Sequence, residues 1–358
     1  MWFIGLDVHA KQSTYCILDA HGKKVRTHTI KGPWDKVLLD LALLPKPWVI
    51  GFEASCGYGV LKERLDKIAQ RVVVAHPGQL RLIFRSKQKN DRVDAEKLAL
   101  LMLLDQMPAV HVPSAEVRAW RSAIEYQQRL IEDRTRLKNR LRALLRGQGI
   151  PALKGLWTRK GLAWLRQQPL ASTWLSLERD DALEQYAQLQ KRLQKLTREL
   201  NRYGGANAAV CLLMTIPGVG PRTAEAVVAY VDDWKRFGRV KQVASYFGLV
   251  PCQDSSAERN RLGHITKQGP RTVRRLLVEA AWQSIRHSPT TKAYFERIVG
   301  ADPDRRKIAL TATAHYLVRV MVGMLRSGKP WHEEEAFINK ASGGEATSTG
   351  ESKGHRLE

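Results

Sequence analysis

The 358-residue sequence has few cysteines and no two of them at metal-binding spacing. Cys16, Cys56, Cys211 and Cys252 are widely separated, so we expect neither a structural zinc site nor a disulfide framework. The ten histidines include no His-x-x-x-His pair of the kind that zinc enzymes use. No run of about eighteen apolar residues is present and the sequence opens with a strand pattern, so we expect no transmembrane helix and no signal peptide. These absences favour a cytosolic protein.

Acidic residues are also scarce relative to basic ones. The chain has 59 Lys and Arg against 35 Asp and Glu, which gives a formal charge of +24 and an isoelectric point near 10.1. This excess indicates a polyanionic partner such as DNA or RNA, with a membrane surface as the second alternative. Because 44% of the residues are hydrophobic, a core can form, and the length suits two or three domains.

Four acidic residues stand where an α/β sheet places its chemistry. Asp7 and Glu53 each follow a short apolar run, which is typical of a buried strand. Asp91 and Asp94 stand three residues apart at an expected helix start, so both carboxylates lie on one helix face. Such a pair is also typical of helix capping. Four gathered carboxylates repel one another unless a cation lies between them, so we predict a Mg²⁺ or Mn²⁺ site at these residues.

The first segment, residues 1–112, has an α/β pattern. Three strands are expected at residues 3–9, 13–18 and 24–30, and two further strands at residues 48–53 and 71–75. Helical spacing at residues 35–44 and 58–70 separates the later strands. Three hairpin strands followed by alternating helices and strands is the order of the ribonuclease-H-like fold.

The second segment, residues 113–205, is rich in long polar helices. A first helix is expected at residues 115–147 and a second from about Asp181, where apolar residues from Tyr186 to Tyr203 alternate steps of three and four. This heptad seam predicts an antiparallel coiled coil or a dimerising arm, and a helical hairpin within one chain is the alternative. The first helix is also basic, and we favour phosphate contact over a solvated face for these six residues: Arg134, Arg136, Lys138, Arg140, Arg142 and Arg146.

The third segment, residues 206–335, is compact and mostly helical. Its Pro-Gly-Val-Gly-Pro turn at residues 217–221 is typical of a helix-hairpin-helix motif, in which Gly218 and Gly220 let backbone amides approach a phosphate. A plain helix–helix turn is the alternative. A polar basic loop is expected at residues 255–269, before an amphipathic helix that Arg271 and Arg274 open. Ser256 lies in this loop among cations, although loop serines commonly form turns. Residues 336–358 lack an apolar period and are expected to be disordered.

Six ordered motifs resemble one family over nearly the whole chain, the DEDD-type transposases of bacterial insertion sequences, which include the Piv invertase and bridge-RNA-guided recombinases. The matching N-terminal motifs are Gly5-Leu6-Asp7-Val8-His9, Phe52-Glu53-Ala54-Ser55 and Asn90-Asp91-Arg92-Val93-Asp94-Ala95. The C-terminal motifs are Ile216-Pro217-Gly218-Val219-Gly220, Gly248-Leu249-Val250-Pro251 and Gly263-His264-Ile265-Thr266-Lys267-Gln268-Gly269.

The resemblance implies a fold and a mechanism. In the family a RuvC-like domain carries the four acids, and a serine five residues after the proline of Gly-Leu-x-Pro is the nucleophile. By position this serine is Ser256, next to Ser255, and a phosphate there would meet Arg259, Arg261, Lys267, Arg271 and Arg274. The resemblance further implies a 5′-phosphoserine intermediate, donor and target DNA, a structured guide RNA, and dimers that assemble into a tetramer on bacterial nucleoid DNA.

Two other functions stay open on the residues alone. A water-using nuclease or Holliday-junction resolvase needs the four acids but no serine. A basic nucleic-acid-binding scaffold needs only the charge and the hairpin motif. A covalent protein–DNA adduct would indicate the recombinase, and free cleaved ends would indicate the nuclease.

Overall fold

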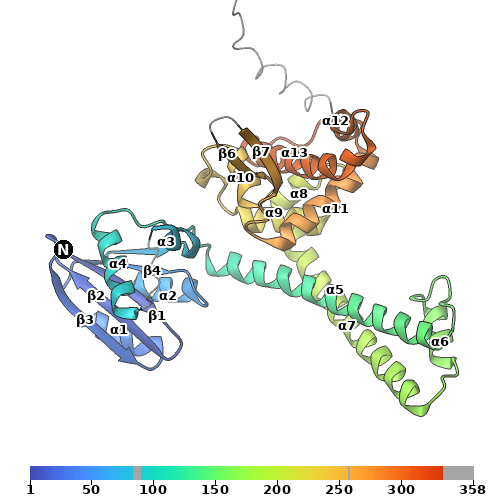
Figure 1. Cartoon of the computed structure of the whole chain (residues 1–358), viewed down its shortest axis with the longest axis horizontal. Helices are drawn as coiled ribbons and strands as arrows, with labels where there is room; N and C mark the ends of the chain where they lie inside the picture. The colour runs from blue at the N-terminus through green and yellow to red at the C-terminus, as the bar shows by residue number, and fades with distance from the viewer. Residues whose placement is uncertain (84–89, 257–258, 334–358) are drawn as a thin grey trace, which may run out of the picture. The chain divides into compact units, whose positions relative to one another are not determined.

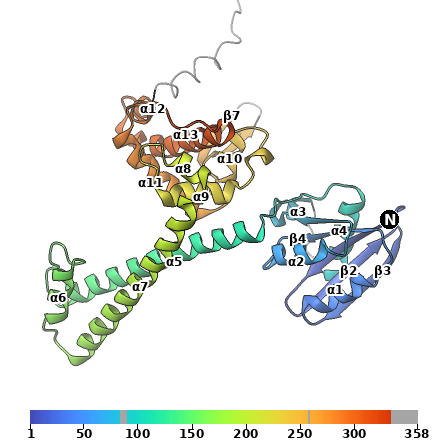
Figure 2. The ribbon, with the colours of Figure 1, turned by 180° about the vertical axis from the view of Figure 1, so that it is seen from behind.

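The computed structural model describes residues 1–83, 90–256 and 259–333, and at residues 254–256 and 259–262 it describes the backbone. The chain divides into two compact units, Met1–Arg118 and Ala119–Glu358 (Figure 1; Figure 2 shows the reverse side). The units have separate hydrophobic cores. Unit 1 is a mixed α/β domain with a central sheet, and unit 2 is mostly helical.

Unit 1 is built on a five-stranded sheet. Strands β1 (Trp2–Val8), β2 (Gln12–Leu18) and β3 (Lys24–Lys31) form an antiparallel meander. Strands β4 (Trp48–Glu53) and β5 (Arg71–Ala75) extend the sheet on the other side of β1, with β4 parallel to β1 and β5 parallel to β4. The order is β3-β2-β1-β4-β5, so β1 lies at the centre of the sheet.

Four helices accompany this sheet: α1 (Trp34–Ala42), α2 (Tyr58–Leu65), α3 (Pro77–Ile83) and α4 (Asp91–Leu103). The buried side chains of Ile4 and Leu6 on β1 belong to the core that also contains residues of α1 and α2. Gly5, between them, faces α4, because a Cβ at Gly5 would lie 2.0 Å from Ala95 O and 2.2 Å from Ala99 N. The missing side chain therefore lets α4 pack backbone to backbone against β1 (Figure 1).

Unit 2 contains a long helical hairpin. Its helices are α5 (Ala115–Gly147), α6 (Arg159–Gln167) and α7 (Thr173–Gly205). Gln127 Nε2 on α5 donates to Thr197 Oγ1 on α7 at 2.9 Å, and Arg134 Nη1 donates to Gln190 Oε1 at 3.2 Å. The later residue on α5 contacts the earlier residue on α7, so the two helices run antiparallel.

The apolar seam of α7 is covered by its own chain. Tyr186, Leu193 and Leu200 are 5%, 6% and 3% exposed. Tyr186 packs in a cluster with Leu137 of α5, and Leu200 belongs to a cluster that includes Ile124 of α5. This arrangement agrees with the intramolecular hairpin, and burial of the seam requires no second copy.

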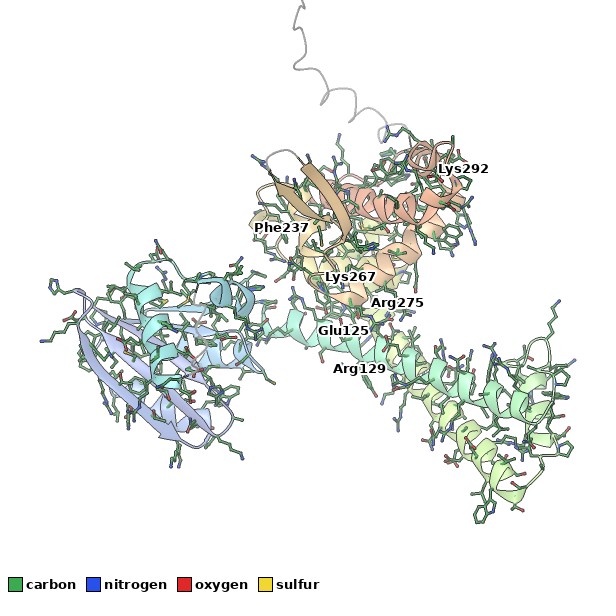
Figure 3. All side chains as sticks on the ribbon, in the orientation of Figure 1. Glu125, Arg129, Phe237, Lys267, Arg275 and Lys292 are labelled. Atoms are coloured by element: carbon green, nitrogen blue, oxygen red, sulfur yellow. The ribbon has the colours of Figure 1, made fainter. Side chains whose placement is uncertain are left out.

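The remainder of unit 2 is a helical bundle with one β-hairpin. Its elements are α8 (Ala208–Leu213), α9 (Pro221–Val231), η1 (Trp234–Arg236), α10 (Lys241–Tyr246), β6 (Pro251–Ser256), β7 (Arg259–Ile265), α11 (Arg271–His287), α12 (Pro289–Val299), η2 (Pro303–Arg305) and α13 (Arg306–Ser327). Glu125 on α5 accepts hydrogen bonds from Tyr230 Oη at 2.7 Å and Thr272 Oγ1 at 2.8 Å (Figure 3). These bonds join the long hairpin to α9 and α11.

One segment of unit 2 is long and apolar. The segment Pro303–Ser327, which includes α13, is long and apolar enough to span a membrane by length and composition, and half of its most apolar window is buried. The core helix of a globular protein passes the same test, so the expectation of no transmembrane helix stays a prediction. The helix is apolar because it packs in the core of unit 2, where Leu317, Met321 and Val322 are fully buried.

Most expected elements are confirmed to within a few residues, with three exceptions. The loop expected at residues 255–269 is wrong at residues 255–256 and 259–265, which belong to the antiparallel strands β6 and β7, whereas residues 266–269 form no helix or strand. Helix α7 begins at Thr173, capped by Ser172, eight residues before the expected start. The short helix α3 was not expected. The segment 336–358, expected to be disordered, lies outside the described residues.

Candidate functional site

Two of the predicted acids lie at the ends of neighbouring parallel strands. Leu6 on β1 is paired with Phe52 on β4, so Asp7 and Glu53 follow at the same level. Side chains alternate along a strand, and Gly5 faces α4, so Asp7 points to the same face. Neighbouring strands lie about 4.8 Å apart, so the backbone of Glu53 is one strand spacing from that of Asp7.

The other two acids lie in the first turn of α4. The helix is capped by Asn90, whose side chain accepts from Arg92 N at 3.0 Å. Asp91 and Asp94 follow, where the partial positive charge of the helix N-terminus stabilises carboxylates. Because α4 packs on β1 through Gly5, its first turn lies beside Asp7. Asp94 lies 3.6 Å from Lys97 Nζ on the next turn.

A histidine completes a compact group with two of these acids. His9 Nε2 lies 3.2 Å from Asp7 Oδ2 and 3.7 Å from Asp91 Oδ1. The ligand atoms of Asp7, His9 and Asp91 all lie within 4.8 Å of one another. Among the described residues, this is the one such group of potential metal ligands, and it includes neither Glu53 nor Asp94.

The electrostatics of this group favour a cation. Burial raises the pKa of Asp7, and the neighbouring Asp91 and Asp94 raise it further, whereas His9 lowers it. The raised pKa shows that a negative charge on Asp7 is costly without a counter-charge. Carboxylate oxygens are the ligands that Mg²⁺ and Mn²⁺ prefer, and imidazole is also a ligand for transition metals. The donor set therefore fits a divalent metal ion.

Gln12 holds one of the acids in place. Its Nε2 donates to Asp91 Oδ2 at 2.7 Å, which leaves Oδ1 directed towards His9. Neither Gln12 nor His9 was predicted as a site residue. His9 stands two residues after Asp7, on the same strand face by alternation, and this spacing was the available signal. For Gln12 the sequence gives no signal, because its contact depends on the turn from β1 to β2.

The predicted nucleophile lies on the β-hairpin of unit 2. Ser255 and Ser256 are the last two residues of β6, paired with Asn260 and Arg259 of β7. The side chains of these residues and of Arg261 lie outside the described part of the structure. The backbone alone therefore places Ser256 at the end of a strand, next to the hairpin connection.

The base of this hairpin is held by Arg274. Its Nη1 lies 3.1 Å from Phe247 O, 2.5 Å from Gln268 O and 3.1 Å from Gly269 O, so one guanidinium joins both ends of the hairpin. Arg274 was predicted to contact nucleic acid, and this stays a prediction, because the hydrogen bonds to backbone carbonyls involve Nη1 alone. Lys267 is exposed next to Gln268, whose carbonyl Arg274 contacts, and its backbone φ is 54° (Figure 3). Arg271 is exposed at the start of α11.

The two glycines of the expected phosphate turn have different surroundings. Gly218 has φ of 87°, and a Cβ there would lie 2.3 Å from Ser284 N on α11. Close packing against α11 therefore accounts for Gly218. Gly220 caps α9 and has no atom within 4 Å of a built Cβ, so a ligand can approach its backbone. Because packing explains the glycine at position 218, this position favours the alternative of a plain helix–helix turn.

The six basic residues predicted on α5 do not form one face. Lys138 Nζ lies over the rings of Trp157 and Tyr186 at 5.0 and 5.8 Å, and Arg142 lies over Trp157 at 5.5 Å. Arg134 is bound to Gln190. Arg136 and Arg140 lie one turn apart on a different face, and Arg146 is exposed near the end of the helix. Half of the set therefore packs against the hairpin's own aromatic and polar side chains.

Comparisons with known proteins link both units to one group. Residues 4–149 match the family model for the DEDD domain of IS110 transposases, and residues 210–296 match the model described as the transposase IS116/IS110/IS902 family. A Pseudomonas aeruginosa protein named “Probable family 20 transposase” is 32% identical over 79% of this chain and 84% of its own length. A transposase for insertion sequence element IS1111A of Coxiella burnetii is 27% identical over 79% of this chain and 78% of its own length. The DEDD domain implies a divalent metal.

Proposed function

Because the chain belongs to the IS116/IS110/IS902 family of insertion-sequence transposases, we propose that it cuts and rejoins DNA with a divalent metal site and a serine nucleophile. The observation that carries the metal part is the group Asp7, His9 and Asp91, where β1 ends beside the first turn of α4. Glu53 and Asp94, on the adjoining strand and helix turn, complete the acid set. The strand order β3-β2-β1-β4-β5 supports the proposal that unit 1 is a RuvC-like domain.

The metal ion, Mg²⁺ or Mn²⁺, would be held by Asp7, Asp91, Glu53 and Asp94. When bound, it would polarise the scissile phosphate and stabilise the charge on the entering and leaving oxygens. The protein's own residues keep the acids in position: Gln12 fixes the rotation of Asp91, and His9 contacts both Asp7 and Asp91. Asp7 and Asp91 thereby lie close together even though 83 residues separate them in sequence.

Ser256 is proposed as the nucleophile. Its oxygen attacks the phosphorus, the bond from phosphorus to the 3′ oxygen breaks, and a 5′-phosphoserine and a free 3′ hydroxyl result. Attack by a 3′ hydroxyl on the phosphoserine then rejoins DNA and restores the serine, so no ATP is required. Support for Ser256 comes from its position five residues after Pro251 and from the exposed cations Lys267 and Arg271 near the hairpin base. Arg259 and Arg261 are proposed to contact the same phosphate.

Partners and location follow from the family resemblance and the charge. The formal charge of +24 supports binding to donor and target DNA and to a structured guide RNA. Dimers that assemble into a tetramer on bacterial DNA, in the cytoplasm, complete the proposal. The exposed residues Arg136, Arg140, Arg146 and Gly220 remain in the proposed nucleic-acid surface. Arg134, Lys138, Arg142, Gly218 and Arg274 have packing partners that explain them without nucleic acid.

Substitution of the acids tests the metal part. Asp91→Asn removes one ligand charge and should abolish strand cleavage of supercoiled DNA in Mn²⁺, while filter binding of the same DNA stays within about twofold. Asp66→Asn is the matched control and should retain cleavage, because Asp66 is an exposed acid that pairs with Lys62. Wild-type cleavage by Asp91→Asn would remove the metal site from the proposal. Cleavage that leaves free ends and no protein-linked DNA would support the water-using nuclease.

A further inference from the structure

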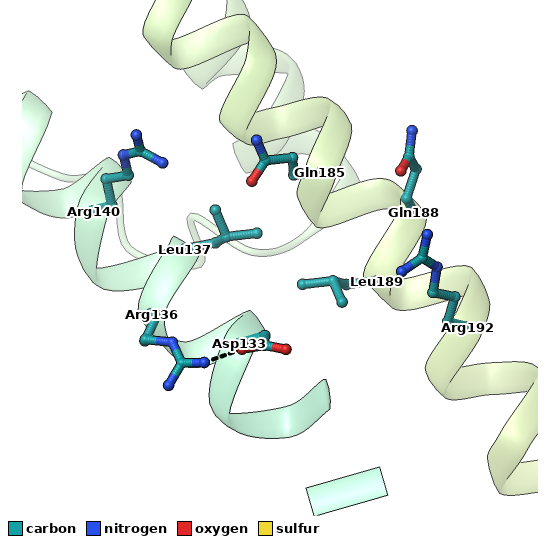
Figure 4. Close-up of a pocket in the computed structure, with 8 residues that line it drawn as sticks. All are labelled: Asp133, Arg136, Leu137, Arg140, Gln185, Gln188, Leu189 and Arg192. Carbon is teal, nitrogen blue, oxygen red and sulfur yellow. Dashed lines mark hydrogen bonds and ion pairs between the residues drawn. The ribbon is translucent and has the colours of Figure 1, made fainter. Parts of the chain in front are cut away.

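An open groove lies along the hairpin of α5 and α7, with a volume of about 440 Å³. Arg136 and Arg140 line it from α5, and Arg192 lines it from α7. Leu137 and Leu189 point towards each other between the helices (Figure 4). The groove thus has guanidinium groups on both walls and an apolar floor, and its volume lies in the range of small-molecule sites.

The cations of the groove retain free donors. Arg136 is paired with Asp133, the one acid that lines the groove. Arg140 donates its Nε to Glu178 Oε1 at 3.1 Å, which leaves its two terminal nitrogens for a ligand. Arg192 is exposed, and within the described residues no ion pair of Arg192 is found. The lining carries three positive charges and one negative charge.

The groove lies at one end of an unusually basic stretch of chain. Between Asp133 and Glu178 there are ten Lys and Arg residues and no Asp or Glu. Burial lowers the pKa of Lys138, and the positive charges of Arg134 and Arg142 lower it further. Like charges at these spacings destabilise a helix. A bound polyanion would relieve this repulsion, whereas a neutral or basic partner would not.

We propose that this groove binds a single strand of DNA, with phosphates on Arg136, Arg140 and Arg192 and the base or sugar of one nucleotide against Leu137 and Leu189. Unpaired strands can place a base on an apolar surface, while duplex DNA keeps its bases stacked inside. The choice of DNA rests on the proposed function, because cutting and rejoining strands exposes unpaired segments. The wall formed by Gln188, Leu189 and Arg192 lies outside both regions that match the family models.

Two exposed neighbours on α7 give a matched test. Arg192 lines the groove and Lys191 does not, so Arg192→Ala and Lys191→Ala remove the same charge from adjacent positions. Binding of a labelled oligothymidylate of about eight nucleotides is measured by fluorescence anisotropy. The full-length protein is used with EDTA, so the result does not depend on cleavage. Gln188→Ala and Gln194→Ala form a second, uncharged pair, because Gln188 lines the groove and Gln194 is exposed elsewhere on α7.

The proposal predicts that Arg192→Ala weakens binding about tenfold and lowers the slope of log affinity against log salt by about 0.7, the value for one phosphate contact on a single strand. Lys191→Ala should stay within about twofold, and Gln188→Ala should weaken binding more than Gln194→Ala does. Binding of a blunt duplex should respond equally to both charge variants.

Three results would overturn the proposal. Equal losses for Arg192→Ala and Lys191→Ala would mean diffuse attraction without a groove site. An effect on an oligouridylate but none on the oligothymidylate would make RNA the occupant. Unchanged affinity together with an altered mass of the protein in light scattering would make a second copy of the chain the occupant. A chain that binds as predicted but never cleaves DNA would refute only the proposed function.

Discussion

The most informative single substitution is Gly5→Ala, because it tests how the fold brings the acids together. The new Cβ would lie 2.0 Å from Ala95 O and 2.2 Å from Ala99 N, whereas ordinary contacts begin at 3.4 Å. Both clashing atoms belong to the backbone of α4, so no side chain can rotate out of the way. We expect α4 to shift away from β1 by more than about 1 Å.

The cost of this shift follows from its geometry. Overpacking in a core costs about 1–3 kcal/mol, and a clash of backbone with backbone should lie at the upper end, about 3 kcal/mol. For a unit of this size, the melting temperature should fall by roughly 10 °C. The shift also carries Asp91 away from Asp7, and misplacement by about 1 Å costs roughly 100-fold in rate.

Calorimetry, hydrogen exchange of α4 peptides and a cleavage assay in Mn²⁺ measure these effects. Gly323→Ala in α13 is the matched control, because no atom lies within 4 Å of a built Cβ there, and this change should stabilise the helix slightly. If Gly5→Ala melted, exchanged and cleaved like the wild type, the backbone contact could not be what positions the acids.

Three further predictions concern single contacts. Gln12→Ala removes the hydrogen bond that fixes the rotation of Asp91, so it should weaken Mn²⁺ binding 10- to 100-fold. A Mn²⁺ titration followed by paramagnetic resonance measures this loss, and the melting temperature should stay unchanged. Burial raises the pKa of Glu225 from 4.5 to about 7, so unfolding stability should fall as pH rises from about 4.5 to 7, by up to roughly 3 kcal/mol. Glu225→Gln should flatten that dependence in denaturant titrations, and an unchanged slope would show that Glu225 is not its source. Arg274→Ala should speed amide exchange at Thr266, because the three backbone carbonyls that Arg274 Nη1 contacts lose their donor. Unchanged exchange at Thr266 would show that Arg274 does not hold the base of the hairpin.

The sheet of unit 1 could be predicted because its strands are short apolar runs separated by polar turns. The strands around Asp7 and Glu53 were confirmed for this reason. The hairpin at residues 251–265 was missed, because its strands are polar, carry little alternation and are held by backbone pairing and by Arg274. The early start of α7 was missed because the heptad seam begins only at Tyr186, thirteen residues after the helix does.

The candidate site could be predicted in part. The acids were found because each stands at a strand end or helix start, positions that sequence spacing reveals. The contacts made by His9 and Gln12 depend on the turn after β1 and on the closeness of α4, which spacing does not encode. The contacts of the basic residues on α5 could not be predicted either, because their charge does not reveal that Lys138 and Arg142 lie over the ring of Trp157.

We propose above that Ser256 forms a covalent bond with DNA. The direct test is to incubate the full-length protein with nicked or mismatched insertion-sequence ends and Mn²⁺, quench, digest and map the protein-linked nucleotide by mass spectrometry. We expect a 5′-phosphate on Ser256, lost in Ser256→Ala and retained in Ser255→Ala and in the control Ser176→Ala, which changes a half-buried serine on α7. Recombination by Ser256→Ala with no protein-linked nucleotide would contradict the serine mechanism and leave water as the nucleophile.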